Sequence, residues 1–313
     1  MNIIITGGFG YLGSNLAKFL QKKNTIYLIS RQKKRKPAWL KNGKVFQVNW
    51  DNNTDKIKKI FLESDILIIS SGVNASNCLK NPQEYLDYNK ITLNKILSYC
   101  KKFLLKKVIY FSSAHIYSSN LSGYIDENSP LKNKHHYAIS KKIVEKNIIN
   151  FSKKNPEIHF YILRLSNVFG GEINSKSNSW NLVINDFCKS SVKFNKIIIN
   201  SKKNFLRNFL PISDLFKLIN VLIDLNNNYN YQIINVGTEN SFSINKLALI
   251  IQSRFKKIFN KKPEIIINKK FDYKSFEYIY ASIYRKKIIK FNKDSFNKDL
   301  DKVIKYTTKL HGQ

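Results

Sequence analysis

The sequence has few cysteines and no long apolar run. Its 313 residues include only three cysteines, Cys78, Cys100 and Cys188. They are too few and too scattered for a disulfide framework or a thiolate metal site, so a reducing cytoplasm is the expected location. No apolar run approaches the roughly 20 residues of a membrane helix. The first residues also lack the basic start and the cleavage site of a signal peptide. We therefore expect neither a membrane span nor secretion.

Acidic residues are scarce as well. The chain has 21 aspartates and glutamates against 54 lysines and arginines, which gives a formal net charge of +33. Such a surplus can attract nucleic acid, an acidic membrane surface or small anions. The lysines are spread along almost every segment, however, and their clearest cluster is the loop 31–36. We interpret the charge as a compositional bias of solvated faces, with nucleic-acid binding as the alternative.

Short apolar segments alternate with longer amphipathic segments through the first half of the chain. This alternation predicts βαβ units around a buried parallel sheet. The expected strands are 3–6, 25–30, 45–48, 65–70, 107–112 and 158–163, and the expected helices are 11–22, 53–62, 84–102 and 137–153.

After Arg164 the alternation becomes irregular, with a Gly170-Gly171 break and a polar stretch. The later elements expected are a helix at 180–190, a strand at 193–200, a helix at 213–225, a strand at 231–236 that could return to the main sheet, and a short strand near Ile265. We expect two parts. Residues 1–166, with about 205–237, form the first domain, and residues 167–204 and 238–313 form most of a smaller α/β lobe.

Three glycines, Gly7, Gly10 and Gly13, follow the first predicted strand and lead into the first helix. Glycine permits a tight turn, a close approach of the backbone to phosphate, and close packing of the helix on the strand. The helix begins near Tyr11 and Leu12, and its N-terminal N–H groups would point at a pyrophosphate. The pattern predicts a Rossmann-type, doubly wound sheet that binds a dinucleotide.

The end of the second predicted strand bears on which dinucleotide is bound. A site that prefers NAD usually has a carboxylate here for the ribose hydroxyls, whereas this chain has Ser30 and Arg31. A hydroxyl and a guanidinium suit a 2′-phosphate, and the basic loop adds further positive charge. We predict NADP(H) in preference to NAD(H). In the alternative, Arg31 is only the first solvated residue of the loop.

Tyr137 and Lys141 lie four residues apart on a predicted helix, so they share one face. A tyrosine alone has a pKa of about 10, and a neighbouring ammonium group lowers that pKa. Such a tyrosine can be the general acid of a carbonyl reduction or the general base of an alcohol oxidation. Ser113 follows the predicted strand 107–112, at the sheet edge where ligands gather, and its hydroxyl could bind the reacting oxygen. Together these residues suggest a redox enzyme.

With these motifs in this order, the chain resembles the extended short-chain dehydrogenase/reductases of the NAD-dependent epimerase/dehydratase family, which act on nucleotide sugars. The resemblance is carried by the segments 7–13, 88–89, 111–117, 137–141, 164–170, 207–210 and 235–237. It implies Ser113, Tyr137 and Lys141 as the catalytic trio and a substrate-binding role for the C-terminal lobe. The cofactor contacts that it implies are Ser70, Ser71, Gly72 and Asn89, with Asn49 and Trp50 near the adenine. Tyr137 and Lys141 are expected to contact the cofactor as well, with Lys141 orienting its ribose.

The resemblance also implies substrate contacts. Asn167 and Arg207 match positions that contact the substrate diphosphate, for which a guanidinium fork is suited. His115 matches the position of one acid/base group in the family's epimerase-reductases that resemble GDP-fucose synthase. Glu172 lies near the position of their other acid/base group. In the alternative, His115 is structural or only contacts the substrate.

The chain departs from the family pattern at two places. One departure limits which reactions are expected, and the other lies in the loop before Tyr137. The family's 4,6-dehydratases carry an Asp-Glu pair where this chain has Ala114-His115, so dehydratase activity is not expected. His135 and His136 replace the Ser-Pro that usually precedes the tyrosine, and both are expected at the surface or at the pocket rim.

The sequence as a whole predicts a cytoplasmic NADP(H)-dependent oxidoreductase that reduces a keto group of a nucleotide-diphosphate deoxyhexose, for surface polysaccharide precursors. One alternative keeps the site but runs a 4-epimerase cycle with tightly retained NAD. The other, from a different class, is a family member that binds nucleic acid. The resemblance implies a homodimer through the helices 84–102 and 137–153, and no His, Cys and carboxylate spacing suggests a metal site.

Overall fold

The computed structural model of the chain describes residues 1–48, 54–72, 82–171, 179–200, 205–226, 229–239, 241–267 and 277–312. Two compact units are present. The first comprises Met1–Ser119, Leu131–Arg164 and Ile219–Ile234, and the second comprises Asn120–Pro130, Leu165–Leu218 and Asn235–Gln313.

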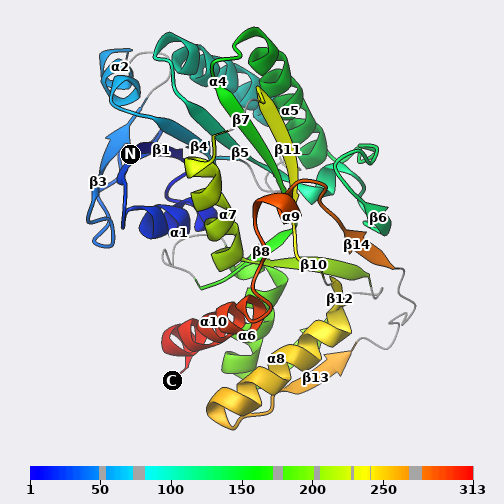
Figure 1. Cartoon of the computed structure of the whole chain (residues 1–313). Coiled ribbons are helices and arrows are strands. Elements are labelled where there is room, and N and C mark those ends of the chain that lie inside the picture. The colour runs from blue at the N-terminus through cyan, green and yellow to red at the C-terminus, as the bar shows by residue number, and fades with distance from the viewer. Residues whose placement is uncertain are drawn as a thin grey trace. The chain divides into compact units, whose positions relative to one another are not determined.

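A seven-stranded sheet in the order β11-β7-β5-β4-β1-β2-β3 forms the centre of the first unit (Figure 1). Its strands are β1 (Asn2–Thr6), β2 (Thr25–Ser30), β3 (Gly43–Gln47), β4 (Ile66–Ile69), β5 (Lys107–Ser113), β7 (His159–Leu165) and β11 (Tyr231–Val236). The pairings of β1 with β2 and β4, of β2 with β3, and of β4 with β5 are parallel. The expected doubly wound α/β sheet is confirmed, and the strand predicted at 231–236 does return to it.

The direction of winding changes between β1 and β4. From β1 the chain continues on one side to β2 and β3, and β4 then begins on the other side. At such a switch point the connections leave the sheet in opposite directions, and a crevice opens at the carboxyl ends of the two strands. The residues that follow β1 and β4 therefore face the crevice.

The helices of this unit are α1 (Tyr11–Leu20), α2 (Thr54–Leu62), α4 (Pro82–Lys102), α5 (His136–Lys154) and the C-terminal part of α7 (Ile212–Asp224), from Ile219 onward. Every residue of β4 and β5 is buried, as is usual for strands whose two faces are both covered. Apolar side chains of α2, α4 and α5 pack on these strands, among them Phe61, Leu97 and Ile148. This packing explains why β4 is entirely apolar and why β5 has an unbroken apolar segment at 108–111.

The second unit contains three small sheets. A three-stranded sheet has the order β12-β10-β8, and two parallel pairs are formed by β9 with β13 and by β6 with β14. The strands are β6 (Gly123–Ile125), β8 (Asn167–Phe169), β9 (Lys196–Ile199), β10 (Leu206–Pro211), β12 (Ser241–Ser243), β13 (Glu264–Ile267) and β14 (Tyr278–Tyr280).

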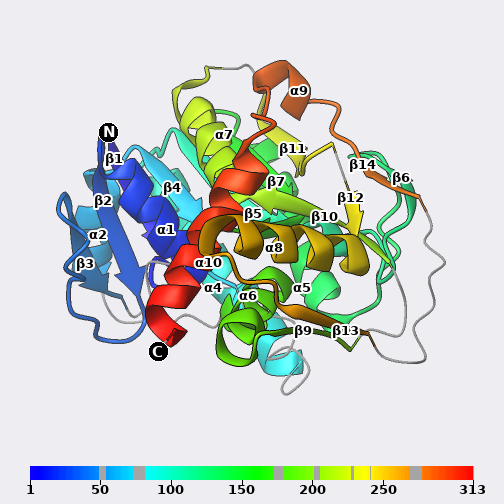
Figure 2. The ribbon, with the colours of Figure 1, turned by 90° about the horizontal axis from the view of Figure 1, so that it is seen from below.

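The helices α6 (Val183–Phe194), α8 (Ile244–Phe259) and α10 (Ser295–His311) pack together, and α6 and α8 also lie beside the β9 and β13 pair (Figure 2). They enclose a separate core that includes Phe187, Leu247 and Leu300. The short helix α9 (Arg285–Ile288) and the 3-10 turn η2 (Ser179–Asn181) complete the unit.

The predicted helix at 180–190 and strand at 193–200 are displaced in the structure. The helix α6 begins at Val183 and continues to Phe194, where Asn195 ends it in the left-handed conformation with φ 51°. Asparagine tolerates this conformation and commonly ends helices in this way. The strand β9 is therefore confined to Lys196–Ile199.

Among the described residues, no helix combines the length and the apolar composition needed to cross a membrane.

Candidate active site

The glycine turn is shaped for a phosphate group. Gly7 has φ +70°, and a Cβ there would lie 2.6 Å from the backbone nitrogen of Ser71. A Cβ on Gly13 would lie 2.6 Å from the Ser70 hydroxyl, so both positions need glycine for close packing. At Gly10 the nearest protein atom to an added Cβ is the Gly7 carbonyl oxygen, at 3.2 Å. Gly10 is thus open on the crevice side, where a backbone can approach a ligand.

The N-terminus of α1 adds a favourable charge to this turn. Gly10 is its N-cap and brings no side chain, and the first turn of α1 contains no acidic residue. The positive end of the helix dipole is therefore not neutralised from within the helix, and such an end favours a bound anion.

A pocket lies beside this turn, with an empty volume of about 790 Å³. Its lining residues are Thr6, Gly7, Phe9, Gly10, Ile29, Ser30, Arg31, Ser70, Ser71, Gly72, Thr92 and Ile96. The ends of β1 and β4 are joined here, because the Ser70 hydroxyl donates to the Thr6 carbonyl at 2.7 Å and the Thr6 and Ser71 hydroxyls lie 2.9 Å apart. The cradle, the helix end and the pocket together fit a dinucleotide.

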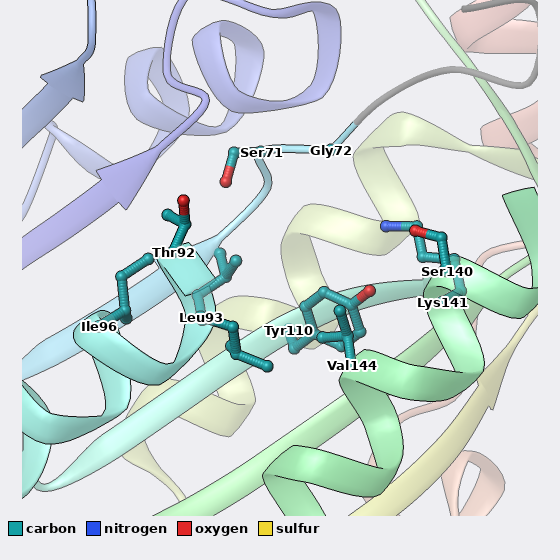
Figure 3. A pocket seen from close by; sticks show the side chains of 10 residues that line it. Ser71, Gly72, Thr92, Leu93, Ile96, Tyr110, Ser140, Lys141 and Val144 are labelled. Carbon is teal, nitrogen blue, oxygen red and sulfur yellow. The ribbon is translucent and has the colours of Figure 1, made fainter. Parts of the chain in front are cut away.

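A second pocket, of about 440 Å³ empty volume, is lined by Ile69, Ser71, Gly72, Thr92, Leu93, Ile96, Tyr110, Ser140, Lys141 and Val144 (Figure 3). It shares Ser71, Gly72, Thr92 and Ile96 with the first pocket, so the two are adjacent. The crevice therefore runs from the glycine turn to the helix α5, which carries Lys141.

The amine of Lys141 is held in a fixed place. Its side chain is only 8% exposed, and its Nζ donates to the Phe111 carbonyl at 2.8 Å. The Nζ lies 4.9 Å from the centre of the Tyr110 ring and 5.9 Å from that of Tyr137. A Cβ on Gly72 would lie 3.2 Å from this Nζ. The ammonium group is thus fixed between β5 and the crevice, close to Tyr137.

Two tyrosines, Tyr110 and Tyr137, lie near this amine, and they differ in burial and therefore in their suitability for proton transfer. Tyr110 is buried, and burial, with the nearby Glu145 carboxylate and Tyr137, raises its pKa well above the usual value. It therefore keeps its proton and serves as an aromatic face for Lys141. Tyr137 is only half-buried, in the first turn of α5. Of the two, Tyr137 is the one suited to proton transfer.

Ser113 is the last residue of β5 and is buried. Its Oγ accepts from the His115 amide at 3.2 Å and caps the 3-10 turn η1 (Ala114–Ile116). The His115 side chain is exposed.

A buried ion pair joins the elements that carry these groups. Arg164 on β7 and Glu145 on α5 are 3–4% exposed, and Nη2 of the arginine lies 2.8 Å from Oε2 of the glutamate. The Glu145 carboxylate also accepts from the hydroxyl of Ser112, the neighbour of Ser113. Arg164 Nη1 donates to the Tyr117 hydroxyl at 2.7 Å. The network fixes α5 against both β5 and β7.

Eight of the predicted residues line the two adjacent pockets: Gly7, Gly10, Ser30, Arg31, Ser70, Ser71, Gly72 and Lys141. Tyr137 lies near the Lys141 amine, and Tyr11 and Leu12 open α1. Asn49 and Trp50 lie outside the described residues, as does Glu172 of the substrate set. Asn89 belongs to α4, but its side chain is also outside the described part. Among the described residues, no group of three His, Cys, Asp or Glu side chains could hold a metal ion.

The two other predicted substrate residues belong to the second unit. Asn167 on β8 donates to the Asn208 carbonyl at 2.9 Å, which ties it to β10. Arg207, on β10 itself, is exposed, although nearby protein atoms desolvate its guanidinium and lower its pKa. The ordinary pKa of an arginine lies far above neutral pH, so Arg207 remains a cation that can bind phosphate oxygens.

Several residues of the crevice were not anticipated from the sequence. Thr92 and Ile96 of α4 line both pockets, and Tyr110 supports Lys141. The four-residue spacing of Thr92 and Ile96 is visible in the sequence, but the same spacing is usual for any helix that packs on a sheet.

Comparison with known proteins identifies relatives along most of the chain. The model of the NAD dependent epimerase/dehydratase family matches residues 3–237. The chain is 28% identical to a putative UDP-glucose 4-epimerase of Methanocaldococcus jannaschii over 254 residues, which are 80% of this chain and 81% of that protein. It is 26% identical over 263 residues to the ADP-L-glycero-D-manno-heptose-6-epimerase of Brachyspira hyodysenteriae, with 81% of each chain covered.

Solved structures share the fold. A UDP-glucose 4-epimerase of Thermotoga maritima with UDP-glucose has a TM-score of 0.81 at 18% identity, over 99% of both chains. The UDP-glucose 4-epimerase of Bifidobacterium longum, in complex with NAD+ and UDP, has a TM-score of 0.80 at 17% identity, over 100% of both. At these identities the structures establish the fold, and the family match establishes the relationship. The chain belongs to the NAD dependent epimerase/dehydratase family, as an NAD(P)-dependent enzyme.

Proposed function

We propose that the chain is a 4-epimerase of a UDP-sugar, with Ser113, Tyr137 and Lys141 as its catalytic residues. The observation that carries the proposal is the fixed amine of Lys141, held by the Phe111 carbonyl beside Tyr137 in a crevice that begins at the glycine cradle. The match to UDP-glucose 4-epimerases supports the choice of reaction. The predicted keto-sugar reductase remains the second candidate, treated below.

The glycine cradle and the pocket beside it would hold the dinucleotide, which would supply hydride acceptance and hydride return at carbon 4 of the sugar. Tyr137 takes the proton of the 4-hydroxyl as the ketone forms and gives it back when the ketone is reduced. Lys141 would stabilise the phenolate of Tyr137 by its positive charge. Tyr137 thus serves as base and then as acid in one cycle.

Ser113 would hold the reacting oxygen. A hydroxyl that accepts one hydrogen bond still has its own hydrogen to donate. In Ser113 the His115 amide occupies an acceptor site of the oxygen, which leaves the hydroxyl hydrogen for the sugar oxygen. The ketone that forms at carbon 4 is polarised by this bond.

We assign the substrate diphosphate to Arg207 and Asn167 of the second unit. A guanidinium can bind two phosphate oxygens at once. The hydrogen bond from Asn167 to β10 supports this assignment, because it holds the asparagine on the strand that carries Arg207. His115 is assigned to contact with the sugar, and Glu172 is retained as a candidate acid/base group.

Epimerisation is tested by incubating the purified enzyme with UDP-glucose, UDP-N-acetylglucosamine or UDP-glucuronic acid and following the sugar protons by NMR. Conversion of one of them to its 4-epimer is expected. Tyr137→Phe should abolish conversion, whereas Tyr124→Phe, which removes an exposed hydroxyl, should not. Full conversion by Tyr137→Phe would contradict the assignment.

The second candidate is an NADPH-dependent reductase of a nucleotide keto-sugar. Ser30 and Arg31 favour it, because both line the cofactor pocket where a carboxylate would favour NAD. An epimerase retains its nicotinamide, whereas a reductase must exchange it at each turnover. Absorbance of the purified protein in the nicotinamide band, and NADPH consumption with a panel of keto-sugars, distinguish the two.

We further propose a homodimer through α4 and α5. These helices pack against each other and bound an open groove of about 1200 Å³ empty volume, lined by Asn94, Leu97, Ser98, Lys101, Lys102, Asn147, Asn150, Phe151 and Lys154. A second copy would bring three lysines from each side close together, so dimerisation should strengthen as salt screens the repulsion. Light scattering after size exclusion at low and high salt tests this. A monomer under both conditions would refute it.

A further inference from the structure

The first turn of α5 is capped by a histidine. A helix begins with N–H groups that have no partner inside the helix. In α5 the N-cap is His135, with φ −65° and ψ 138°, and its Nδ1 accepts from the Tyr137 amide at 3.2 Å. Serine, threonine, aspartate and asparagine are the usual N-caps. Unlike those side chains, an imidazole can accept at Nδ1 only while that nitrogen carries no proton.

The capping histidine is itself held by the segment after Ser113. The His135 amide donates to Asn133 Oδ1 at 2.9 Å, and Asn133 Nδ2 donates to the His115 carbonyl at 2.5 Å. Lys142 Nζ donates to the Asn133 carbonyl at 2.6 Å. A line of hydrogen bonds thus runs from η1, which Ser113 caps, through Asn133 and His135 to the backbone of Tyr137.

We propose that His135 is a positioning residue: in its neutral form it fixes the first turn of α5, which carries Tyr137, against η1, and its protonation releases that turn. The inference rests on the proposed catalytic role of Tyr137. It goes beyond that role because it predicts that turnover falls at low pH through a residue that does not touch the substrate.

Two effects act together when His135 takes up a proton. The imidazolium can no longer accept from the Tyr137 amide. It also places a positive charge at the positive end of the α5 dipole, which is unfavourable. Lys132 and Lys134 are close to His135 in the sequence, Lys142 Nζ donates to the Asn133 carbonyl, the His115 carbonyl accepts from Asn133 Nδ2, and the ring centres of His135 and His136 are 6.5 Å apart. The three lysines are cations, so their charge adds to the repulsion.

The test compares His135→Ser with the wild-type enzyme. Serine caps a helix without titrating between about pH 5 and pH 8, where histidine does. With a UDP-sugar that the enzyme converts, wild-type kcat should fall several-fold from pH 8 to pH 5.5 with little change in KM. The kcat of His135→Ser should equal that of the wild type at pH 8, and it should decrease much less than the wild-type kcat at pH 5.5. His135→Ala should be several-fold slower at both pH values, and His136→Ser, the matched neighbour, should keep the wild-type profile.

A second measurement does not depend on turnover. Hydrogen exchange of peptides from the first turn of α5 should show less protection in the wild type than in His135→Ser at pH 5.5, and equal protection at pH 8. Equal protection at both values, or a kcat profile of His135→Ser that retains the wild-type fall, overturns the inference. If instead Tyr137→Phe is fully active while the exchange difference is present, the catalytic role of Tyr137 is wrong and the histidine cap stands.

Discussion

Replacing Glu145 by glutamine should destabilise the first unit strongly. Arg164 and Glu145 are 4% and 3% exposed, and their guanidinium and carboxylate groups are joined by more than one hydrogen bond. Breaking a buried pair by removing one charge leaves the other charge desolvated and unpaired, which costs about 3–5 kcal/mol. Glutamine keeps the shape and one acceptor oxygen, so the lower end of this range, about 3 kcal/mol, is expected for Glu145→Gln.

The matched control is Asp301→Asn in the second unit. Asp301 of α10 also forms a two-bond pair, with Arg254 of α8, but these side chains are 25% and 18% exposed. Pairs with access to solvent contribute roughly 0–1 kcal/mol. Urea unfolding of both variants and the wild type, followed by fluorescence and circular dichroism, measures the two losses. If Glu145→Gln costs no more than Asp301→Asn, the burial argument is wrong.

Three further predictions concern the cofactor cradle and the sheet. Gly13→Ala should weaken dinucleotide binding at least tenfold by fluorescence titration, because its Cβ would lie 2.6 Å from the Ser70 hydroxyl; unchanged binding would contradict the cradle geometry. Arg31→Asp should weaken NADPH binding more than NADH binding in the same titration, and equal weakening would refute a 2′-phosphate role. Burial raises the pKa of Asp65, but Lys106 and the Asn2 amide outweigh it, so the net pKa is lowered. This stabilisation is present above the unfolded-state pKa and is lost as pH falls through the folded-state pKa. Asp65→Asn should therefore cost more stability in urea at pH 7 than at pH 3, and an equal cost at both would refute the ion pair.

The strands and helices that could be predicted are those whose sequence pattern of apolar and polar residues matches the burial of their side chains in the structure. The strands β4 and β5 are covered on both faces, so β4 is entirely apolar and β5 contains the apolar segment 108–111. The strands β6, β8, β12 and β14 have three residues each. A segment that short contains too little alternation to be recognised, and its pairing partners lie far away in the chain.

The same distinction applies to the site. The spacing of Tyr137 and Lys141 follows from helix geometry, so it was visible in the sequence. What holds the amine of Lys141 was not visible, because it is a backbone carbonyl and an aromatic face of β5. For His135 the sequence revealed only a departure from a familiar pattern. Its capping bond became evident once the course of the backbone through Asn133 was known.

The choice of dinucleotide and the choice of reaction are separable in this molecule. Ser30 and Arg31 line only the pocket beside the glycine turn, whereas Lys141 lines only the adjacent one. A change at Arg31 should therefore alter which cofactor binds without altering the proton chemistry, and a change at Tyr137 should do the reverse. An epimerase that retains NADP(H) is consequently compatible with both sets of residues. The identity of the retained cofactor decides the role of Arg31, and retention itself decides between epimerase and reductase.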